Sequence, residues 1–381
     1  MTRPRRLRSA LLPAAALLFA ACAGGAPSLQ TPESSGPTGT GADATGAPST
    51  ADPSQAATGP CGTVTQAEPA LTEERLTVYS GRNEELVAPI IACFTEATGI
   101  AVDVRYGDTA ELAGTILEEG ENSPADVFFA QDAGALGALA AEGRLVELPG
   151  ELLSSVPDRF RSPEGRWVGV SGRARVVAYN TDKLTEDELP DSILDYTDPA
   201  WEGRIGWAPT NGSLQSFVTA LRQLEGDEAA LAWLEGIQAN EPMVYDGNTP
   251  ALEAVASGVV DVAFINHYYL FGQLEEQGED YPAANQFLTG GDPGALVNVA
   301  GVGVLDTSDQ PEVALQFAEY LLSEEAQTYF AQRTYEYPLI EGVALDPRLP
   351  ALDEIGSPEL DLSDLADLQG TLDLMREAGV L

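Results

Sequence analysis

Short β-type runs and helical patterns alternate along most of this chain, and this alternation limits its fold more than any other feature. Residues 76–80, 101–106 and 126–130 have the apolar and β-branched character of strands. Residues 84–98 and 109–119 have the spacing of apolar residues expected of helices. Strands that alternate with helices usually form a parallel sheet with the helices packed on its faces. The sequence therefore predicts an α/β protein.

The alternation continues towards the C-terminus. Around residues 168–179 it is less regular, because two strand-like runs flank Ser171-Gly172-Arg173. Elsewhere we expect strands at 205–208, at 262–265 and within 295–305, and helices at 133–142, from Ser213, Asp227 and Pro250, and over 312–322 and 324–332. In open parallel sheets, ligands bind beyond the carboxyl ends of the strands. Polar residues follow three predicted strands at such ends, namely Arg82-Asn83-Glu84, Gln131-Asp132 and Asn266-His267-Tyr268-Tyr269.

The first 70 residues indicate export from the cytoplasm. Four arginines precede an apolar run that is too short to span a bilayer, which is typical of a secretory signal peptide at 1–21. Small residues then lead into Cys22, in a pattern that resembles a bacterial lipobox. We expect Cys22 to carry a lipid anchor, the alternative being a plain secretory signal with an incidental cysteine. Residues 22–70 are rich in Gly, Pro, Ser, Thr and Ala, which predicts a flexible linker.

The rest of the chain, residues 71–381, is longer than one core usually accommodates, so we expect two domains. The formal net charge of the whole chain is −41. Nucleic acid is excluded as a partner, because binding it requires a basic surface.

Two cysteines, Cys61 and Cys93, remain once Cys22 is assigned to the lipid. Outside the cytoplasm such an even pair favours a disulfide, which would tie the end of the linker to the first helix. A buried free thiol at Cys93 is the alternative.

The inventory of reactive side chains is poor for catalysis. The chain has one histidine, His267, and contains no Gly-x-Ser-x-Gly, His-Glu-x-x-His or phosphate-loop motif. Its single lysine, Lys183, lies in a polar turn. A hydrolase that uses two carboxylates remains an alternative, but the inventory favours a binding protein.

The adjacent tyrosines Tyr268 and Tyr269 are the most specific chemical signal. A phenol has an ordinary pKa of about 10, so it ionises at neutral pH only with strong help. A hard trivalent cation gives such help and prefers oxygen ligands. The alternative is an aromatic pair that packs over a sheet edge.

Six stretches in order give the chain a resemblance to a known family. They are Leu-Thr-Val-Tyr-Ser-Gly-Arg at 76–82, Ser-Pro-Ala-Asp-Val-Phe-Phe at 123–129, Ser-Gly-Arg-Ala-Arg-Val-Val at 171–177, Arg-Ile-Gly-Trp-Ala-Pro-Thr-Asn-Gly-Ser at 204–213, Asn-His-Tyr-Tyr at 266–269 and Asp-Pro-Gly-Ala-Leu-Val at 292–297. With them, most of 71–381 resembles the periplasmic ferric-binding proteins of bacterial ABC iron transporters.

The resemblance implies a two-lobed periplasmic-binding-protein-like fold of type II with hinge-crossing strands. Lobe 1 would hold 71–173 plus 299–348, and lobe 2 would hold 174–298 plus 349–381. It further implies a monomer that closes on its cargo and delivers it to an ABC permease and its ATPase. With the predicted signal and anchor, the protein would lie on the extracytoplasmic side of the cell membrane.

The resemblance also implies a site for Fe³⁺ as cargo. Tyr268 and Tyr269 would supply two phenolate ligands, and carbonate or phosphate would complete the shell as a synergistic anion. The residues that correspond to the family's anion site, with two arginines as nearby charge partners, are Asn211, Gly212, Ser213, Asn248, Asn266, Arg173 and Arg175. A helix N-terminus suits an anion because its N–H groups are free and its dipole is positive there.

The chain departs from the family in the first lobe. Many members have histidine and glutamate ligands where this chain has Asn83 and Gln131, which are neutral and weak donors. Glu84, Asp132 or Tyr106 could serve as metal ligands in their place. His267 is either a direct metal ligand or a residue that orients a ligand. Two alternatives follow: the same fold could bind an organic ion on which the tyrosines stack, or the chain could be a surface-anchored hydrolase.

Overall fold

The computed structural model describes residues 74–381, all of which belong to one compact unit. The predicted signal peptide 1–21, the lipid-bearing Cys22, the linker 22–70 and Cys61 lie outside the described residues, so these predictions stay predictions. Within 74–381, no helix is both long and apolar enough to cross a membrane.

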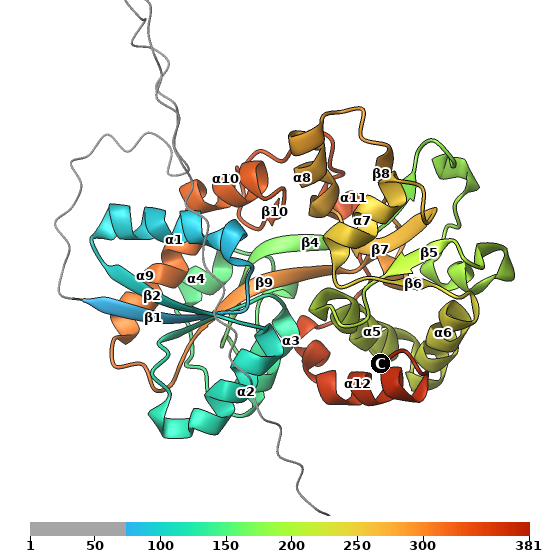
Figure 1. Ribbon diagram of the computed structural model, residues 1–381. Helices are drawn as coiled ribbons and strands as arrows, with labels where there is room; N and C mark the ends of the chain where they lie inside the picture. Colours follow the sequence, from blue (N-terminus) through green and yellow to red (C-terminus); the bar gives the residue numbers. More distant parts are fainter. Residues whose placement is uncertain (1–73) are drawn as a thin grey trace, which may run out of the picture. The chain divides into compact units, whose positions relative to one another are not determined.

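Ten strands of the described chain join into one sheet, in the order β2-β1-β3-β9-β4-β7-β5-β6, with β8 and β10 paired to β4 (Figure 1). The strands are β1 Arg75–Ser80, β2 Ala101–Tyr106, β3 Val127–Ala130, β4 Val168–Asn180, β5 Ile205–Trp207, β6 Met243–Val244, β7 Val262–Asn266, β8 Ala283–Gln286, β9 Val297–Val304 and β10 Tyr337–Pro338. The α/β class predicted from the alternation of strands and helices is confirmed.

Helices alternate with these strands along the described chain. They are α1 Glu84–Thr98, α2 Thr109–Glu119, α3 Ala133–Ala141, α4 Gly150–Ser154, α5 Gly212–Glu225, α6 Asp227–Ala239, α7 Asn248–Ala256, α8 Tyr268–Gln277, α9 Pro311–Leu321, α10 Glu324–Arg333, α11 Leu352–Ile355 and α12 Leu368–Glu377, with the short 3₁₀ helix η7 at Leu362–Ala366.

The two ends of the sheet are parallel, and the middle is antiparallel. β1 pairs in parallel with β2 and β3, and β5 pairs in parallel with β6 and β7. Between these groups, β4 and β9 pair with each other in antiparallel orientation (Figure 1). Because β1, β2 and β3 run in the same direction, their carboxyl ends meet at one edge of the sheet, where a ligand site is expected.

The long strand β4 links the two groups of strands. Its residues 168–174 pair with β9, and its residues 175–179 pair with β7. The two strand-like runs predicted around Ser171-Gly172-Arg173 are therefore one continuous strand, and that part of the prediction is wrong. The three residues interrupt the apolar pattern but are buried, and a register shift between Gly169 and Ser171 accommodates the irregularity.

Polar caps fix where the first helices begin. The side chain of Asn83 accepts a hydrogen bond from the Glu85 amide at the start of α1, Asp108 caps α2, and Asp132 caps α3. Such caps satisfy amide groups that have no partner within the helix. Each of these helices therefore begins directly beyond the carboxyl end of a parallel strand.

The C-terminal segment 362–377 joins elements that are far apart in the sequence. Its α12 packs on α5 and α6, and its η7 packs on both α3 and α5. Two glycines of α3 allow this approach, because a Cβ atom at Gly134 would lie 2.4 Å from the carbonyl oxygen of Leu365, and one at Gly137 would lie 2.8 Å from that of Ser363. The segment thus bridges parts of the chain that we predicted to belong to different lobes; the exact lobe boundaries stay a prediction.

Candidate functional site

The two tyrosines are the first two residues of α8, directly after β7. A small apolar cluster that includes Ile265 of β7 and Leu270 of α8 holds this strand-to-helix connection in place. The tyrosine rings stack, with centroids 4.4 Å apart and planes inclined by 28°. The helix was not predicted, because the pair was expected only at a strand end. Its N-terminus favours negative charge, which suits ionised tyrosines.

The hydroxyl group of Tyr268 has no protein partner, although this side chain is only 4% exposed. Buried polar groups are nearly always hydrogen-bonded, so an exception calls for a missing ligand or another specific role. Burial raises the pKa of Tyr269 above the ordinary value of a phenol, and repulsion by the neighbouring Tyr268 raises it further. Tyr269 is therefore neutral unless a strong cation displaces its proton.

Three buried arginines surround the tyrosines. Arg82, Arg173 and Arg175 are each at most 5% exposed. Burial lowers the pKa of Arg175 to about 10, while negative charge on Tyr268 and Tyr269 opposes this shift. Burial likewise lowers the pKa of Arg173, and negative charge on Tyr268 again acts in the opposite direction. Arginine keeps its charge even when it is buried, so positive charge lies beside the pair, although burial still keeps the pKa of Tyr269 above its ordinary value.

One buried carboxylate, Glu336, balances part of this positive charge. Its Oε2 atom accepts hydrogen bonds from Arg82 at 2.7 Å and from the Thr334 hydroxyl at 3.0 Å. Its Oε1 atom lies 4.0 Å from Nε of Arg173 and has no hydrogen-bond partner. Negative charge near the three guanidinium groups thus comes from Glu336, and Asp132 also acts on Arg173. Glu336 was not predicted, because nothing in the sequence distinguishes it from the many other acidic residues.

His267 orients the pair from the preceding position. Its Nδ1 atom accepts a hydrogen bond from the Ala174 amide at 3.1 Å, and its Nε2 atom donates to the Tyr335 carbonyl at 2.7 Å. Burial lowers its pKa to about 4, so it is neutral at physiological pH. Since backbone groups occupy both ring nitrogens, no lone pair is free for a metal. These contacts favour the orienting role over direct ligation, and the role of His267 at a metal stays a prediction.

The residues predicted for the anion lie together at the start of α5. Asn211 caps this helix, and its Oδ1 atom accepts from the Ser213 amide at 3.0 Å and from the Asn248 side chain at 3.2 Å. Arg175 donates to Asn266 at 3.0 Å and to the Ser213 hydroxyl at 3.4 Å. A helix N-terminus with a buried arginine and several amide groups is a suitable site for an anion. Arg173 differs, because its neighbours are Glu336 and Tyr268.

A cleft of about 770 Å³ separates two sets of predicted residues. We call the side formed by Tyr269, Asn211 and Gly212 the phenolate face. We call the opposite side the strand-end face; its polar residues include Asn83, Asp108, Gln131 and Asp132, together with Arg82 and Thr109. The C-terminal segment 362–377 also contributes lining residues. The cleft therefore lies where the carboxyl ends of the parallel strands predicted a ligand.

The two amides of the strand-end face are weak donors, and their side-chain oxygens are engaged. Oδ1 of Asn83 accepts from the Glu85 amide at 2.9 Å, and Oε1 of Gln131 accepts from Arg82 at 3.0 Å. Asp132 caps α3, and burial raises its pKa although Arg173 acts in the opposite direction. Within 74–381, no group of three or more His, Cys, Asp or Glu residues is arranged to hold a metal ion.

Two other candidates lie at the rim of this region. Glu84 is exposed in the first turn of α1 and is absent from the cleft lining. Tyr106 ends β2 and is half-buried; burial, followed by the charge of Glu84, raises its pKa. The structure does not bring Tyr106 into the cleft lining either.

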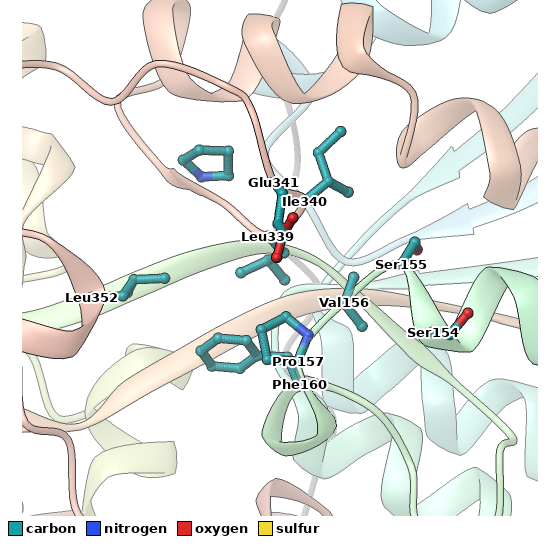
Figure 2. A pocket seen from close by; sticks show the side chains of 10 residues that line it. Ser154, Ser155, Val156, Pro157, Phe160, Leu339, Ile340, Glu341 and Leu352 are labelled. Carbon is teal, nitrogen blue, oxygen red and sulfur yellow. The ribbon is translucent and has the colours of Figure 1, made fainter.

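A second pocket, of about 630 Å³, lies elsewhere, between residues 154–160 and residues 338–341 at the end of β10 (Figure 2). Its lining is mixed: the apolar side chains of Phe160, Leu339 and Ile340 lie next to the polar side chains of Ser154, Ser155 and Glu341. None of the residues predicted for the metal or the anion lines it.

Cys93, the described half of the predicted disulfide, is disulfide-bonded; its pairing with Cys61 stays a prediction.

The fold and the cleft together define a two-lobed binding protein of the periplasmic type. The family model of the bacterial extracellular solute-binding proteins matches residues 90–355 of the sequence. The major ferric iron-binding protein of Neisseria meningitidis serogroup B is 36% identical over 321 residues, which cover 83% of this chain and 96% of that protein. The Fe(3+)-binding periplasmic protein of Serratia marcescens is 33% identical, with 83% and 93% covered.

A solved structure agrees with these relatives. The iron-bound HitA of Pseudomonas aeruginosa superposes with a TM-score of 0.77 at 38% identity, and the match covers 80% of this chain and 99% of that one. The chain belongs to the bacterial extracellular solute-binding proteins, among relatives that are named as ferric iron-binding proteins.

Proposed function

We propose that this protein captures ferric iron outside the cytoplasm through the phenolates of Tyr268 and Tyr269. The observation that carries the proposal is the buried, unpartnered hydroxyl of Tyr268, stacked on Tyr269 beside buried arginines. A trivalent cation would displace both phenolic protons and would find two anionic oxygen ligands in place. The relatives whose names include ferric iron support the same cargo.

A synergistic anion, carbonate or phosphate, would bind at the start of α5. Asn211, Gly212, Ser213, Asn248 and Asn266 would present hydrogen-bond donors, with Arg175 as the charge partner. Two phenolates leave one positive charge on Fe³⁺, and the anion would neutralise it. The network among these side chains in the structure supports the assignment.

We further propose that the two lobes close on the cargo and that an ABC permease with its ATPase receives it. Cys22 would carry the lipid that holds the protein at the outer side of the membrane, and the protein would act as a monomer without catalytic activity. The family match to extracellular solute-binding proteins supports the transport role.

The test is a titration of the purified protein with Fe³⁺ in the presence of carbonate or phosphate, followed by visible absorption. We expect a charge-transfer band that saturates at about one iron per protein, is weaker in Tyr268→Phe and in Tyr269→Phe, and is absent from the double variant. Saturation without a band, or a band that persists in the double variant, would refute the phenolate site. Repeating the titration without either anion tests the anion site.

A further inference from the structure

Glu336 is a buried carboxylate behind the cleft. Its side chain is fully buried and is not among the lining residues. Its Oε2 atom accepts a hydrogen bond from Nη2 of Arg82 at 2.7 Å, and its Oε1 atom lies 4.0 Å from Nε of Arg173. Among residues 74–381, these two arginines form ion pairs with no other carboxylate. Burial of charge costs free energy even when the charges are paired, so this arrangement calls for an explanation.

Arg82 connects Glu336 to the strand-end face. While its Nη2 atom donates to Glu336, its Nη1 atom donates to Oε1 of Gln131 at 3.0 Å. Arg173 belongs to β4, the strand that links the two groups of strands. One buried carboxylate therefore holds a guanidinium group of the strand-end face and lies beside a second one on the linking strand.

The residue before Glu336 has an unusual backbone conformation. Tyr335 has a φ angle of +56°, in the left-handed region that is uncommon for a bulky residue. Its carbonyl oxygen accepts from Nε2 of His267 at 2.7 Å, and its ring stacks on Phe271 of α8 with centroids 5.4 Å apart. The backbone thus holds the start of α8 through Tyr335, while the next side chain reaches Arg82. Strain of this kind is typical of functional sites.

Glu336 and the tyrosine pair act on the same two guanidinium groups. Burial is the largest influence on the pKa of Arg82 and of Arg173 and lowers both, whereas Glu336 and negative charge on Tyr268 act in the opposite direction on each. Nε of Arg82 and two nitrogens of Arg173 have no protein partner. Loss of Glu336 would therefore leave additional positive charge beside the tyrosines, in an interior that screens charge poorly.

We propose that Glu336 is a positioning residue of the iron site. It fixes the guanidinium groups of Arg82 and Arg173 and offsets enough of their charge for a trivalent cation to bind beside them. This role rests on the proposed function, because it requires that Fe³⁺ binds to the phenolates of Tyr268 and Tyr269.

The first test is the visible spectrum of iron-loaded Glu336→Gln. The charge-transfer band moves an electron from a phenolate to the iron, and positive charge beside the phenolates lowers the energy of their electrons. The band should therefore move to shorter wavelength than in the parent protein. The affinity for Fe³⁺ should fall by about 10–100-fold, the usual cost of losing a group that supports metal ligands. Circular dichroism beside each titration restricts the comparison to folded protein.

Variants of the partner charge separate charge from disorder. Arg82→Gln should move the band to longer wavelength, and Arg82→Gln combined with Glu336→Gln, which removes one charge of each sign, should return it to the position in the parent. Glu336→Asp keeps the carboxylate and should also retain that position. Asp103→Asn breaks the exposed pair with Arg75 and is the matched control, with neither a shift of the band nor a change in affinity expected.

The double variant also decides the test if a single variant fails to fold, because it leaves no buried charge of the pair without its partner. Its net charge equals that of the parent, but the fixed guanidinium group is gone. We expect it to bind Fe³⁺ at least about tenfold more weakly than the parent. An affinity equal to that of the parent would contradict the positioning role.

Two further outcomes would overturn the proposal. If Glu336→Gln unfolds more easily but keeps the band position and the iron affinity of the parent, Glu336 serves the fold alone. If both single variants move the band in the same direction, charge is not the cause of the shift. Absence of the band from the parent protein refutes the phenolate site itself, which separates the failure of the two proposals.

Discussion

The two faces of the cleft differ in how their polar groups are held. On the phenolate face, the tyrosines are stacked beside buried arginines, and one hydroxyl has no partner. On the strand-end face, the polar groups cap helices or accept from Arg82, so their hydrogen bonds already have a structural use. We infer from the difference that binding capacity lies where buried polar groups are left unsatisfied, and that polar residues near a cleft can serve the fold alone.

Removal of the tyrosine hydroxyls should produce the largest effect. We expect Tyr268→Phe to weaken ferric binding by at least about 100-fold, because loss of a ligand costs more than loss of a group that merely supports one. The unfolding free energy of the iron-free protein should change by less than about 1 kcal/mol, because that hydroxyl makes no hydrogen bond. Urea denaturation beside the titration checks both; a variant that binds normally but unfolds easily would assign the hydroxyl to structure.

Loss of the buried carboxylate behind the tyrosines should be the largest effect on stability. Glu336→Gln leaves Arg82 without its ionic partner, and a broken buried pair costs about 3–5 kcal/mol. The exposed pair of Arg75 and Asp103 is the matched comparison, and Asp103→Asn should cost about 0.2–1 kcal/mol. Equal losses in the two variants, measured by urea denaturation, would show that burial of the charges is not the cause.

Acid should weaken the fold through His267. Its pKa in the folded protein, about 4, lies below the ordinary value of 6.5. The unfolded chain therefore binds a proton first as the pH falls. The contribution of this group is fully present above pH 6.5 and is lost towards pH 4, by about 3 kcal/mol in total. Carboxylates titrate in an overlapping pH range. The measurement is therefore the unfolding free energy as a function of pH, compared between the parent and His267→Gln. Identical slopes of unfolding free energy against pH would contradict the prediction.

A side chain added between α3 and the C-terminal segment should lower the stability of the protein by a smaller amount. Gly137→Ala would place a Cβ atom 2.8 Å from the Ser363 carbonyl oxygen and should cost about 1–3 kcal/mol. Gly114→Ala in α2 meets no atom within 4 Å and should stabilise by about 0.5–1 kcal/mol. Thermal unfolding of both variants measures the contrast, and destabilisation by both would show that close approach is not the reason for Gly137.

Much of the fold could be predicted, because local signals agree with the tertiary structure. The bounds of α1, β2 and α2 were predicted correctly, since polar caps and apolar spacing fix them. β4 was predicted incorrectly as two runs, because its polar Ser171 and Arg173 are buried by neighbours that are distant in the sequence. The 362–377 segment was not predicted as helical, and its packing depends on contacts with α3 and α5.

The grouping of some candidate site residues was also predicted, but on the family resemblance and not on local signals. The residues around the start of α5 were expected to act together, and the structure joins Asn211, Ser213 and Asn248 by hydrogen bonds. The role of Glu336 depends on a contact with Arg82, 254 positions away in the sequence. The engagement of His267 by two backbone groups likewise depends on residues that no local pattern reveals.

The most direct test of the central claim is a crystal structure of the iron-loaded protein with anomalous scattering measured at the iron edge. The account predicts one anomalous peak within bonding distance of the hydroxyl oxygens of both Tyr268 and Tyr269, with His267 still hydrogen-bonded to the backbone. An iron peak bonded to neither tyrosine would contradict it.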